Sequence, residues 1–246
     1  MIPKIIHYCW LSGDDYPEKI AYCISSWKKH LPDYEFWLWD LNRFDIDSCV
    51  WCKQAFSVKK YAFAADYIRF YALYHHGGIY LDSDVEVIKS FDTFLDLPYF
   101  IGTEFAGCVE PAIMGAEAGW PIAKEMIDYY NSHSFMNPDG SLNMTVCPDV
   151  LDGIVQKHMS RNVISSKSEF QNDPAIFNVF EPTVFSPKES GNPKIVTTEN
   201  TYSIHHFEAS WYPVSKKMYR WSRRVFGAKF TGFLSHIYKR FLFKHK

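Results

Sequence analysis

With 246 residues, 47% of them hydrophobic and 22% charged, the chain excludes a disordered protein and has room for one large core. The net charge of −2 hides an asymmetry, because residues 209–246 hold ten of the 26 Lys and Arg and no Asp or Glu, which leaves 16 − 28 = −12 for residues 1–208. No window reaches the roughly 18 consecutive apolar residues of a membrane span, and the cysteines, with no signal peptide before them, are expected to be reduced cytosolic thiols.

The first forty residues indicate the start of an α/β sheet. Residues 3–13 are a β-rich apolar run that ends in Ser-Gly, and Ile20, Ile24 and Trp27 then recur at helical spacing. Residues 34–40 predict a second strand. The order strand, helix, strand predicts a sheet whose ligand edge lies at the ends of the strands.

A longer helix follows. Residues 59–76 contain good helix formers and neither Pro nor Gly, and the Gly77-Gly78 pair behind them can adopt the left-handed conformation of a C-cap. Residues 121–131 predict a further helix, and residues 132–200 predict short helices, strands and long loops.

An Asp-x-Asp triplet lies directly after the Gly-Gly turn. Ile79 and Leu81 alternate with Tyr80 and Asp82, so the two pairs should lie on opposite faces of a strand. A second extended stretch begins just after Asp84. The two aspartates are therefore expected where one strand ends and the next begins.

Two carboxylates on one side of an extended segment can hold a divalent cation and leave positions open for a diphosphate. Such triplets are also common in acidic turns, but the preceding helix favours the metal. Asp66 and Arg69 are three residues apart, hence on one helical face, and reach the same sheet edge. An Asp-Arg pair on a helix is ordinarily a surface ion pair, yet this one lies inside the apolar sequence AFAADYIRFYAL.

Three motifs, IPKIIHYCW (2–10), FAADYIRFYALYHHGGIYLDSD (63–84) and IHHFEASW (204–211), together resemble glycosyltransferase family 32. These DxD-containing sugar transferases include bacterial capsule and O-antigen enzymes and yeast mannosyltransferases, and are related to the glucosylating domains of large clostridial toxins. The resemblance covers roughly residues 2–105 and 200–211. It implies an α/β fold of the GT-A type, a Rossmann-like mixed sheet flanked by helices, with residues 1–212 as the catalytic domain.

The resemblance also assigns a donor site. Trp10 is expected to stack on the nucleotide base, with core packing as the alternative. Asp66 and Arg69 are expected to bind the sugar hydroxyls and the phosphate, and Tyr80 and Asp82 to contact the donor.

The implied metal is Mn²⁺ or Mg²⁺. Asp84 is expected to bind it directly, with Asp82 beside it, and His206 to be a late ligand whose role His205 could take instead. The toxins use a carboxylate near that place, but imidazole is an acceptable Mn²⁺ ligand. Ser210 and Trp211 would close a mobile loop over the diphosphate. The catalytic residues that the resemblance implies are Asp66, Arg69, Asp82, Asp84 and Trp211.

The expected activity is retaining, metal-dependent transfer of a hexose from a nucleotide-sugar, with a UDP-sugar preferred over GDP-mannose. The expected acceptor is a saccharide, polyprenyl-diphosphate-linked, in bacterial surface polysaccharide synthesis. A hydrolase or phosphotransferase that uses the same metal, and a non-catalytic nucleotide-sugar-binding protein, are the alternatives. Glu104 and Glu110 are candidate acceptor-side carboxylates, each more simply structural or solvated.

Residues 213–246 predict a basic, aromatic helical segment. From Phe226 onward apolar residues recur at three- and four-residue steps with Lys and Arg beside them, which suits an anionic membrane surface. The expected location is cytoplasmic, peripheral on the inner face of the cell membrane. A helix packed on the acidic body and a dimer contact are the alternatives. Nucleic acid is not an expected partner, because the tail lacks a reading motif and the body is acidic.

Overall fold

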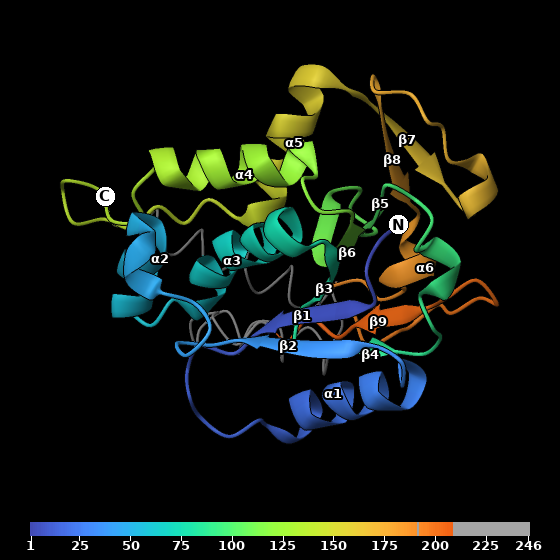
Figure 1. The fold of residues 1–246 in the computed structure, drawn as a ribbon, viewed down its shortest axis with the longest axis horizontal. Helices are drawn as coiled ribbons and strands as arrows, with labels where there is room; N and C mark the ends of the chain where they lie inside the picture. Colours follow the sequence, from blue (N-terminus) through green and yellow to red (C-terminus); the bar gives the residue numbers. More distant parts are fainter. Residues whose placement is uncertain (191, 209–246) are drawn as a thin grey trace, which may run out of the picture.

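A computed structural model describes residues 1–190 and 192–208 of the protein, and shows a seven-stranded mixed sheet with helices on both faces (Figure 1). From one edge to the other the strands are β2 (Glu35–Trp39), β1 (Ile5–Cys9), β3 (Gly78–Leu81), β6 (Val109–Ala116), β5 (Tyr99–Thr103), β8 (Ile176–Phe180) and β7 (Ser160–Ile164). β1 runs parallel to β2 and β3, β6 runs antiparallel to β3 and β5, and β8 runs parallel to β5 and β7. The expected mixed sheet of a GT-A type fold is confirmed.

The helices divide between the two faces of the sheet. One face packs against the helices α2 (Val50–Ser57), α3 (Tyr61–His76), α4 (Pro121–Ser132) and α5 (Cys147–His158). The other packs against α1 (Glu18–His30), α6 (Pro182–Phe185) and a second sheet of β4 (Val85–Val87) with β9 (Ser203–His205). Three short 3₁₀ turns complete the described elements, at Ile46–Ser48, Asp92–Phe94 and Lys167–Glu169.

β3 lies between two hydrophobic cores, one on each face. Tyr80 packs into the core beneath α3, whereas Ile79 and Leu81 pack into the core that contains Trp27 of α1. The predicted alternation along this strand is confirmed. All four of its residues are buried because helices cover both faces of the sheet.

The Gly77-Gly78 turn joins α3 directly to β3. The Gly77 amide donates a hydrogen bond to the Leu73 carbonyl, which ends the helix, and both glycines have positive φ, 64° and 101°. A Cβ on Gly78 would lie 2.7 Å from the Ile5 carbonyl oxygen. Glycine is therefore required for β3 to start close beside β1. The predicted helix over residues 59–76 is confirmed, beginning two residues later.

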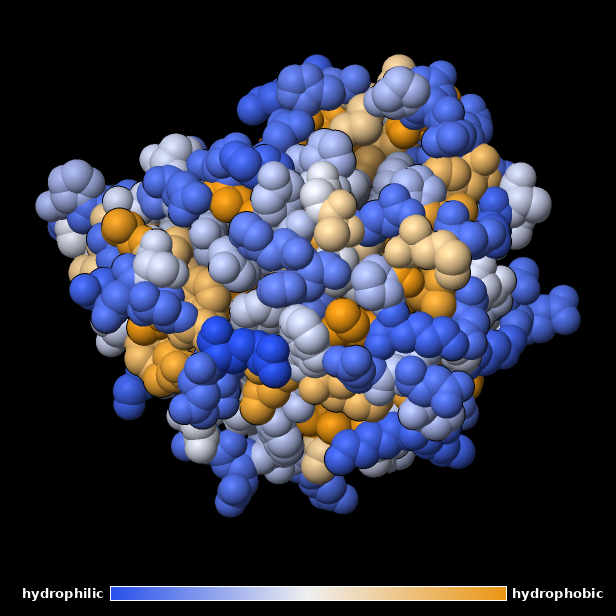
Figure 2. Space-filling model, viewed as in Figure 1, coloured by the Kyte–Doolittle hydropathy of each residue, from blue (hydrophilic) through white to orange (hydrophobic). Residues whose placement is uncertain are grey.

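The predicted strands at residues 3–13, 34–40 and 79–82 and the helix at residues 121–131 are present. β5 and β6, which lie in the middle of the sheet, were not among the predicted elements. The domain boundary at 212 and the helical segment 213–246 lie outside the described residues. None of the helices described is both long and apolar enough to cross a membrane. The face shown in Figure 2 carries hydrophilic side chains with hydrophobic ones scattered among them.

Candidate active site

The Asp-x-Asp triplet forms the turn between β3 and β4. The Asp82 amide donates to the Ala112 carbonyl at 2.8 Å, which extends the pairing of β3 with β6, and the Val85 amide donates to the Asp82 carbonyl at 3.0 Å. The Tyr80 hydroxyl donates to Asp82 Oδ1 at 2.9 Å. The side chain of Asp82 is 26% exposed and that of Asp84 is 12% exposed. The two aspartates thus lie just beyond the end of a central strand, with the Asp82 side chain partly exposed.

Arg69 of α3 reaches this edge and is buried there. Its Nη2 lies 2.9 Å from Asp66 Oδ1 and 3.2 Å from Asp82 Oδ1. Its Nη1 donates to the Pro111 carbonyl at 2.9 Å, and the guanidinium lies 4.8 Å from the Tyr80 ring centroid. Its Nε is buried with no hydrogen-bond partner among the described residues. The expected Asp66–Arg69 pair is therefore part of the site, and Arg69 Nε is left unpaired within it.

His205 brings the C-terminal motif to the aspartates. β9 pairs with β4 so that His205 lies opposite Val85, and His205 Nε2 is 3.3 Å from Asp84 Oδ1. One ligand atom each of Asp82, Asp84 and His205 lies within 4.8 Å of the others. Two carboxylate oxygens and one imidazole nitrogen are a donor set that Mn²⁺ accepts, so these residues fit the implied cation.

His206 points elsewhere. Its Nε2 lies 2.8 Å from Glu86 Oε2, and the Tyr22 hydroxyl donates to Glu86 Oε1 at 2.6 Å. Successive residues of an extended segment point to opposite sides, so only one of two adjacent histidines can face the aspartates. The structure gives that place to His205, the alternative, and not to His206, which was expected first.

The charged groups of the site stabilise one another. Burial opposes the charge on Asp84, but His205 and the Glu208 amide outweigh it and hold the pKa of Asp84 at about 2. Burial also opposes a charge on His205, yet Asp84 and Glu110 raise its pKa well above the ordinary value. Burial raises the pKa of Asp66 to about 7 despite the attraction of Arg69. Asp84 is thus ionised at neutral pH, the form in which a carboxylate binds a cation.

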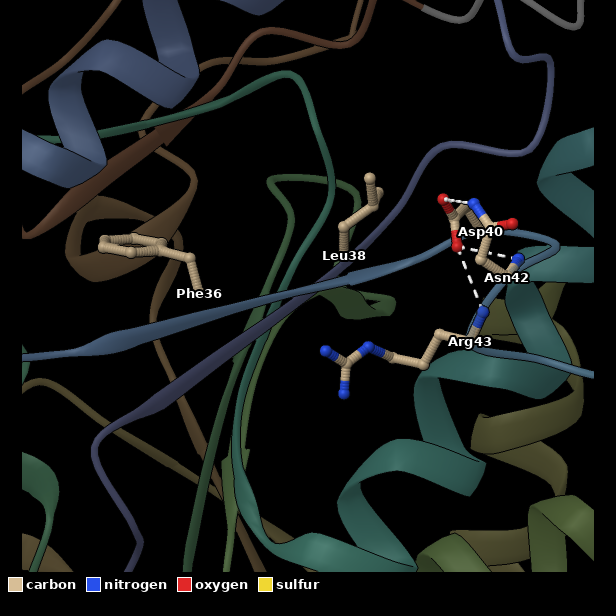
Figure 3. Close-up of a pocket in the computed structure, with 5 residues that line it drawn as sticks. All are labelled: Phe36, Leu38, Asp40, Asn42 and Arg43. Carbon is tan, nitrogen blue, oxygen red and sulfur yellow. Dashed lines mark hydrogen bonds between the residues drawn. The ribbon is translucent and has the colours of Figure 1, made fainter.

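Trp10 follows β1 and lines a separate cavity of about 270 Å³. Its indole Nε1 donates to the Asp14 carbonyl at 2.7 Å, and its ring meets Tyr16 edge-on at 5.1 Å. A cavity of about 510 Å³ shares Leu38 and Asp40 with it (Figure 3). The carboxylate of Asp40 is held there by Asn42 and by the backbone amide of Arg43. Trp10 is partly exposed beside a cavity, and its stacking role stays a prediction.

The site also contains a residue that the sequence analysis placed elsewhere. Glu110 of β6 was expected on the acceptor side, structural or solvated, but it is 8% exposed and its Oε2 lies 3.5 Å from His205 Nδ1. Its signal in the sequence is a single acidic residue inside the apolar run VEPAIMGA. Ser210 and Trp211 lie outside the described residues.

Residues 17–101 match the family model described as a glycosyltransferase sugar-binding region containing a DXD motif. The chain is 31% identical over 130 residues to inositol phosphoceramide mannosyltransferase 3 of Schizosaccharomyces pombe, covering 51% of this chain and 36% of that protein. It is 24% identical over 230 residues to mannosyltransferase 2 of the same organism, covering 91% and 62%. It is 29% identical over 150 residues to mannosyl phosphorylinositol ceramide synthase SUR1 of Saccharomyces cerevisiae, covering 55% and 37%.

Among solved structures, the PaToxG glycosyltransferase matches 52% of this chain and 58% of its own, at 23% identity and a TM-score of 0.43. The chain spans between 36% and 62% of the length of the three curated relatives described. The match to the family model includes α3, the Gly-Gly turn and both aspartates of the triplet. Over residues 17–101 the chain is therefore similar to the sugar-binding region of glycosyltransferases that contain a DXD motif.

Proposed function

We propose that this protein is a metal-dependent glycosyltransferase that moves a hexose from a nucleotide-sugar to a hydroxyl group of its acceptor. One observation carries the proposal. Asp82, Asp84 and His205 converge from two distant segments of the chain, and the buried Arg69 adjoins them with a free donor. A structural ion-pair network would satisfy the Arg69 donors within the protein, whereas a site for a diphosphate needs a donor left over.

Asp82, Asp84 and His205 would hold Mn²⁺ or Mg²⁺, which when bound neutralises charge on the departing nucleoside diphosphate. Arg69 would stabilise the negative charge of the diphosphate through its guanidinium group, which adjoins Asp82. Asp66 and Asp82 both pair with Nη2, and the Pro111 carbonyl accepts from Nη1, so the orientation of the guanidinium is set before the donor arrives. Asp66 would also accept a hydrogen bond from a hydroxyl group of the donor sugar. We nominate no protein nucleophile for the retaining reaction.

The donor and the acceptor are proposed first as chemical classes and then as specific compounds. A nucleotide-bound hexose is proposed on the site residues, and a UDP-sugar with a polyprenyl-diphosphate-linked saccharide remains our first specific choice. The curated relatives are named for mannosyl transfer to inositol phosphoceramide. That name supports GDP-mannose and a lipid acceptor as the second choice, and both choices place the acceptor in a membrane.

A panel of UDP- and GDP-sugars tests the proposal through release of nucleoside diphosphate. Slow donor hydrolysis needs no knowledge of the acceptor, and we expect it for one donor class, with Mn²⁺ or Mg²⁺ and not with EDTA. Adding acceptor membranes should convert hydrolysis into sugar transfer. A protein that only releases free sugar under these conditions is a hydrolase, and one that binds donor without turnover is a binding protein.

Variants of the site test the metal ligands. Asp84→Asn should reduce turnover by about 100-fold or more while the protein stays folded, because an amide cannot replace an anionic ligand on a divalent ion. His205→Gln should also reduce it strongly. His206→Gln is the matched control, since its ring bonds to Glu86, and it should reduce turnover far less. Equal losses from the two histidine variants would contradict the assignment of His205.

A further inference from the structure

Glu110 lies on the far side of the His205 ring from the aspartates. His205 Nε2 is 3.3 Å from Asp84 Oδ1, and His205 Nδ1 is 3.5 Å from Glu110 Oε2. The Glu110 side chain is 9% exposed and that of His205 is 10% exposed. The imidazole therefore lies between two buried carboxylates, each facing a different ring nitrogen.

An irregularity in the sheet holds Glu110 in this place. Ile101 of β5 pairs with Met114, but the next residue, Gly102, pairs with Glu110, so three residues of β6 are skipped between them. Pro111 is the first of these and has no amide hydrogen to offer the neighbouring strand. Glu110 Oε1 accepts a hydrogen bond from the Ala112 amide at 3.3 Å, which ties the carboxylate to the same irregular segment.

Three consecutive residues of β6, 110–112, reach three parts of the site. Glu110 faces His205, the Pro111 carbonyl accepts from Arg69 Nη1 at 2.9 Å, and the Ala112 carbonyl accepts from the Asp82 amide at 2.8 Å. β6 thus sets the relative positions of α3, the Asp-x-Asp turn and β9.

A carboxylate in this position has a definite chemical effect on a histidine ligand. Metal-binding histidines commonly donate the hydrogen of one ring nitrogen to a carboxylate, which fixes the ring orientation and leaves the lone pair of the other nitrogen for the metal. His205 Nδ1 is buried and makes no hydrogen bond to any described residue, and the Glu110 carboxylate lies 3.5 Å from it. Glu110 is thus the group that Nδ1 faces while Nε2 faces Asp84.

We propose that Glu110 is a positioning residue that holds the His205 ring with Nε2 toward Asp82 and Asp84, and so increases the affinity of this site for a divalent cation. The inference rests on the proposed metal-dependent function. It adds a residue of β6 that acts on the cation through His205 and does not touch the donor.

The role of Glu110 is tested by measuring Mn²⁺ binding to the full chain in the absence of donor and acceptor. The electron paramagnetic resonance signal of free Mn²⁺ reports how much of the ion is bound. Glu110→Val should weaken Mn²⁺ binding by about 10- to 100-fold, the range for loss of such a carboxylate. Glu110→Gln keeps an acceptor for the Nδ1 hydrogen and should lose less. Glu104→Gln is the charge control, because Glu104 interacts electrostatically with Glu110 and His205 without an ion pair to the ring. It should change affinity by less than about threefold.

A double-mutant cycle separates positioning from a general effect of charge. In a His205→Ala protein, Glu110→Val should weaken Mn²⁺ binding no further, because the residue through which Glu110 acts is gone. The same loss in both backgrounds would overturn the inference, as would Mn²⁺ affinity unchanged in both Glu110 variants. Thermal melts without metal show whether each variant folds. If Glu110→Val does not fold, the test is made with Glu110→Gln.

This outcome is separable from that of the proposed function. Normal Mn²⁺ binding with the expected cycle, but no sugar release or transfer from any donor, would refute glycosyl transfer and leave the role of Glu110 standing. Donor turnover, together with an equal loss of Mn²⁺ affinity from Glu110→Val in both backgrounds, would support glycosyl transfer and refute the role of Glu110.

Discussion

The buried charges of the site form a chain of contacts from α3 to β9. Asp66 and Asp82 share Arg69, and Asp84 and Glu110 share His205. Each cation therefore lies between two carboxyl groups, whose attraction opposes the desolvation that burial imposes. This attraction outweighs desolvation at Asp84, whose pKa is lowered, but not at Asp66, whose pKa is raised. The donor set for a cation and the spare Arg69 donor lie where these two groups of charges meet.

Trp10 provides a test of the nucleotide site. Replacing it by alanine should weaken binding of the preferred nucleoside diphosphate by about 1–3 kcal/mol, the effect of one base stacked on an aromatic ring. Trp37→Ala is the control, because this indole packs against Arg43 and His7 and does not line the cavity beside Trp10. Calorimetric titration with UDP and GDP measures both. Unchanged affinity in Trp10→Ala would make the indole a packing residue.

His7 of β1 provides a test of how the free energy of unfolding depends on pH. The His7 ring is buried, with Nε2 2.7 Å from the Gly77 carbonyl and Nδ1 accepting from the Trp39 indole at 3.1 Å. Burial lowers its pKa from 6.5 to about 4, and His76 and Arg43 add to the effect. The unfolded chain therefore binds more protons than the folded one between these two values, so stability rises with pH there.

The difference of about 2.5 pH units corresponds to on the order of 3 kcal/mol, fully present above pH 6.5 and lost as the pH falls toward 4. Denaturant unfolding at several pH values should show this rise in the unfolding free energy. His7→Gln should be less stable overall and show a shallower rise over the same range. An identical slope in both proteins would mean that other groups cause the dependence.

At the scale of elements, β6 connects the core to the site. Its register shift against β5 places residues 110–112 around the aspartates, while its last four residues pair regularly with β3. Gly115 lies in this regular part, and the Phe100 ring of β5 packs directly over it. The strand can be irregular at one end because close packing at the other end holds it in register.

Gly115→Ala tests that packing. The added Cβ would lie 2.1 Å from Cε1 of Phe100, whose ring is fully buried, so the ring must move. We expect a loss of about 1–3 kcal/mol in the free energy of unfolding. Gly153→Ala in α5 is the control, since the backbone of its own helix is the only described structure close to the added Cβ, and it should be neutral or stabilising by up to about 1 kcal/mol. Equal stabilities of the two variants would contradict the prediction.

At the scale of the whole molecule, charge is distributed unevenly between an acidic body and the basic residues 209–246. We propose that this segment binds an anionic membrane surface on the cytoplasmic side and brings the site to a lipid-linked acceptor. The full chain should sediment at low salt with liposomes that contain anionic lipid, and high salt should release it.

A protein that ends at Tyr212 is the comparison. It should stay in the supernatant at both salt concentrations and still hydrolyse donor, because the described site residues all precede it. Equal sedimentation of the two proteins would contradict a membrane role for the segment, and would favour packing of the segment on the body or a contact between copies.

Local chemistry along the chain is enough to predict several features of the site. Residues 59–76 have the composition of a helix and end at two glycines, and the alternation at 79–82 sends Asp82 to the same side as Tyr80. Helix periodicity likewise placed Asp66 and Arg69 on one face. These features follow from backbone geometry over a few residues, so they could be predicted without any knowledge of the rest of the chain.

The other features of the site depend on pairing between distant strands, so they could not be predicted from local patterns. His205 and not His206 faces Asp84 because β9 pairs with β4 in one particular register, and the motif contains both histidines. Glu110 enters the site because β6 skips residues against β5, a shift whose place Pro111 marks but whose size depends on the pairing of the whole strands. Register is set by the burial of whole faces across the sheet. The identity of the candidate ligands is therefore local, whereas their arrangement is a property of the folded chain.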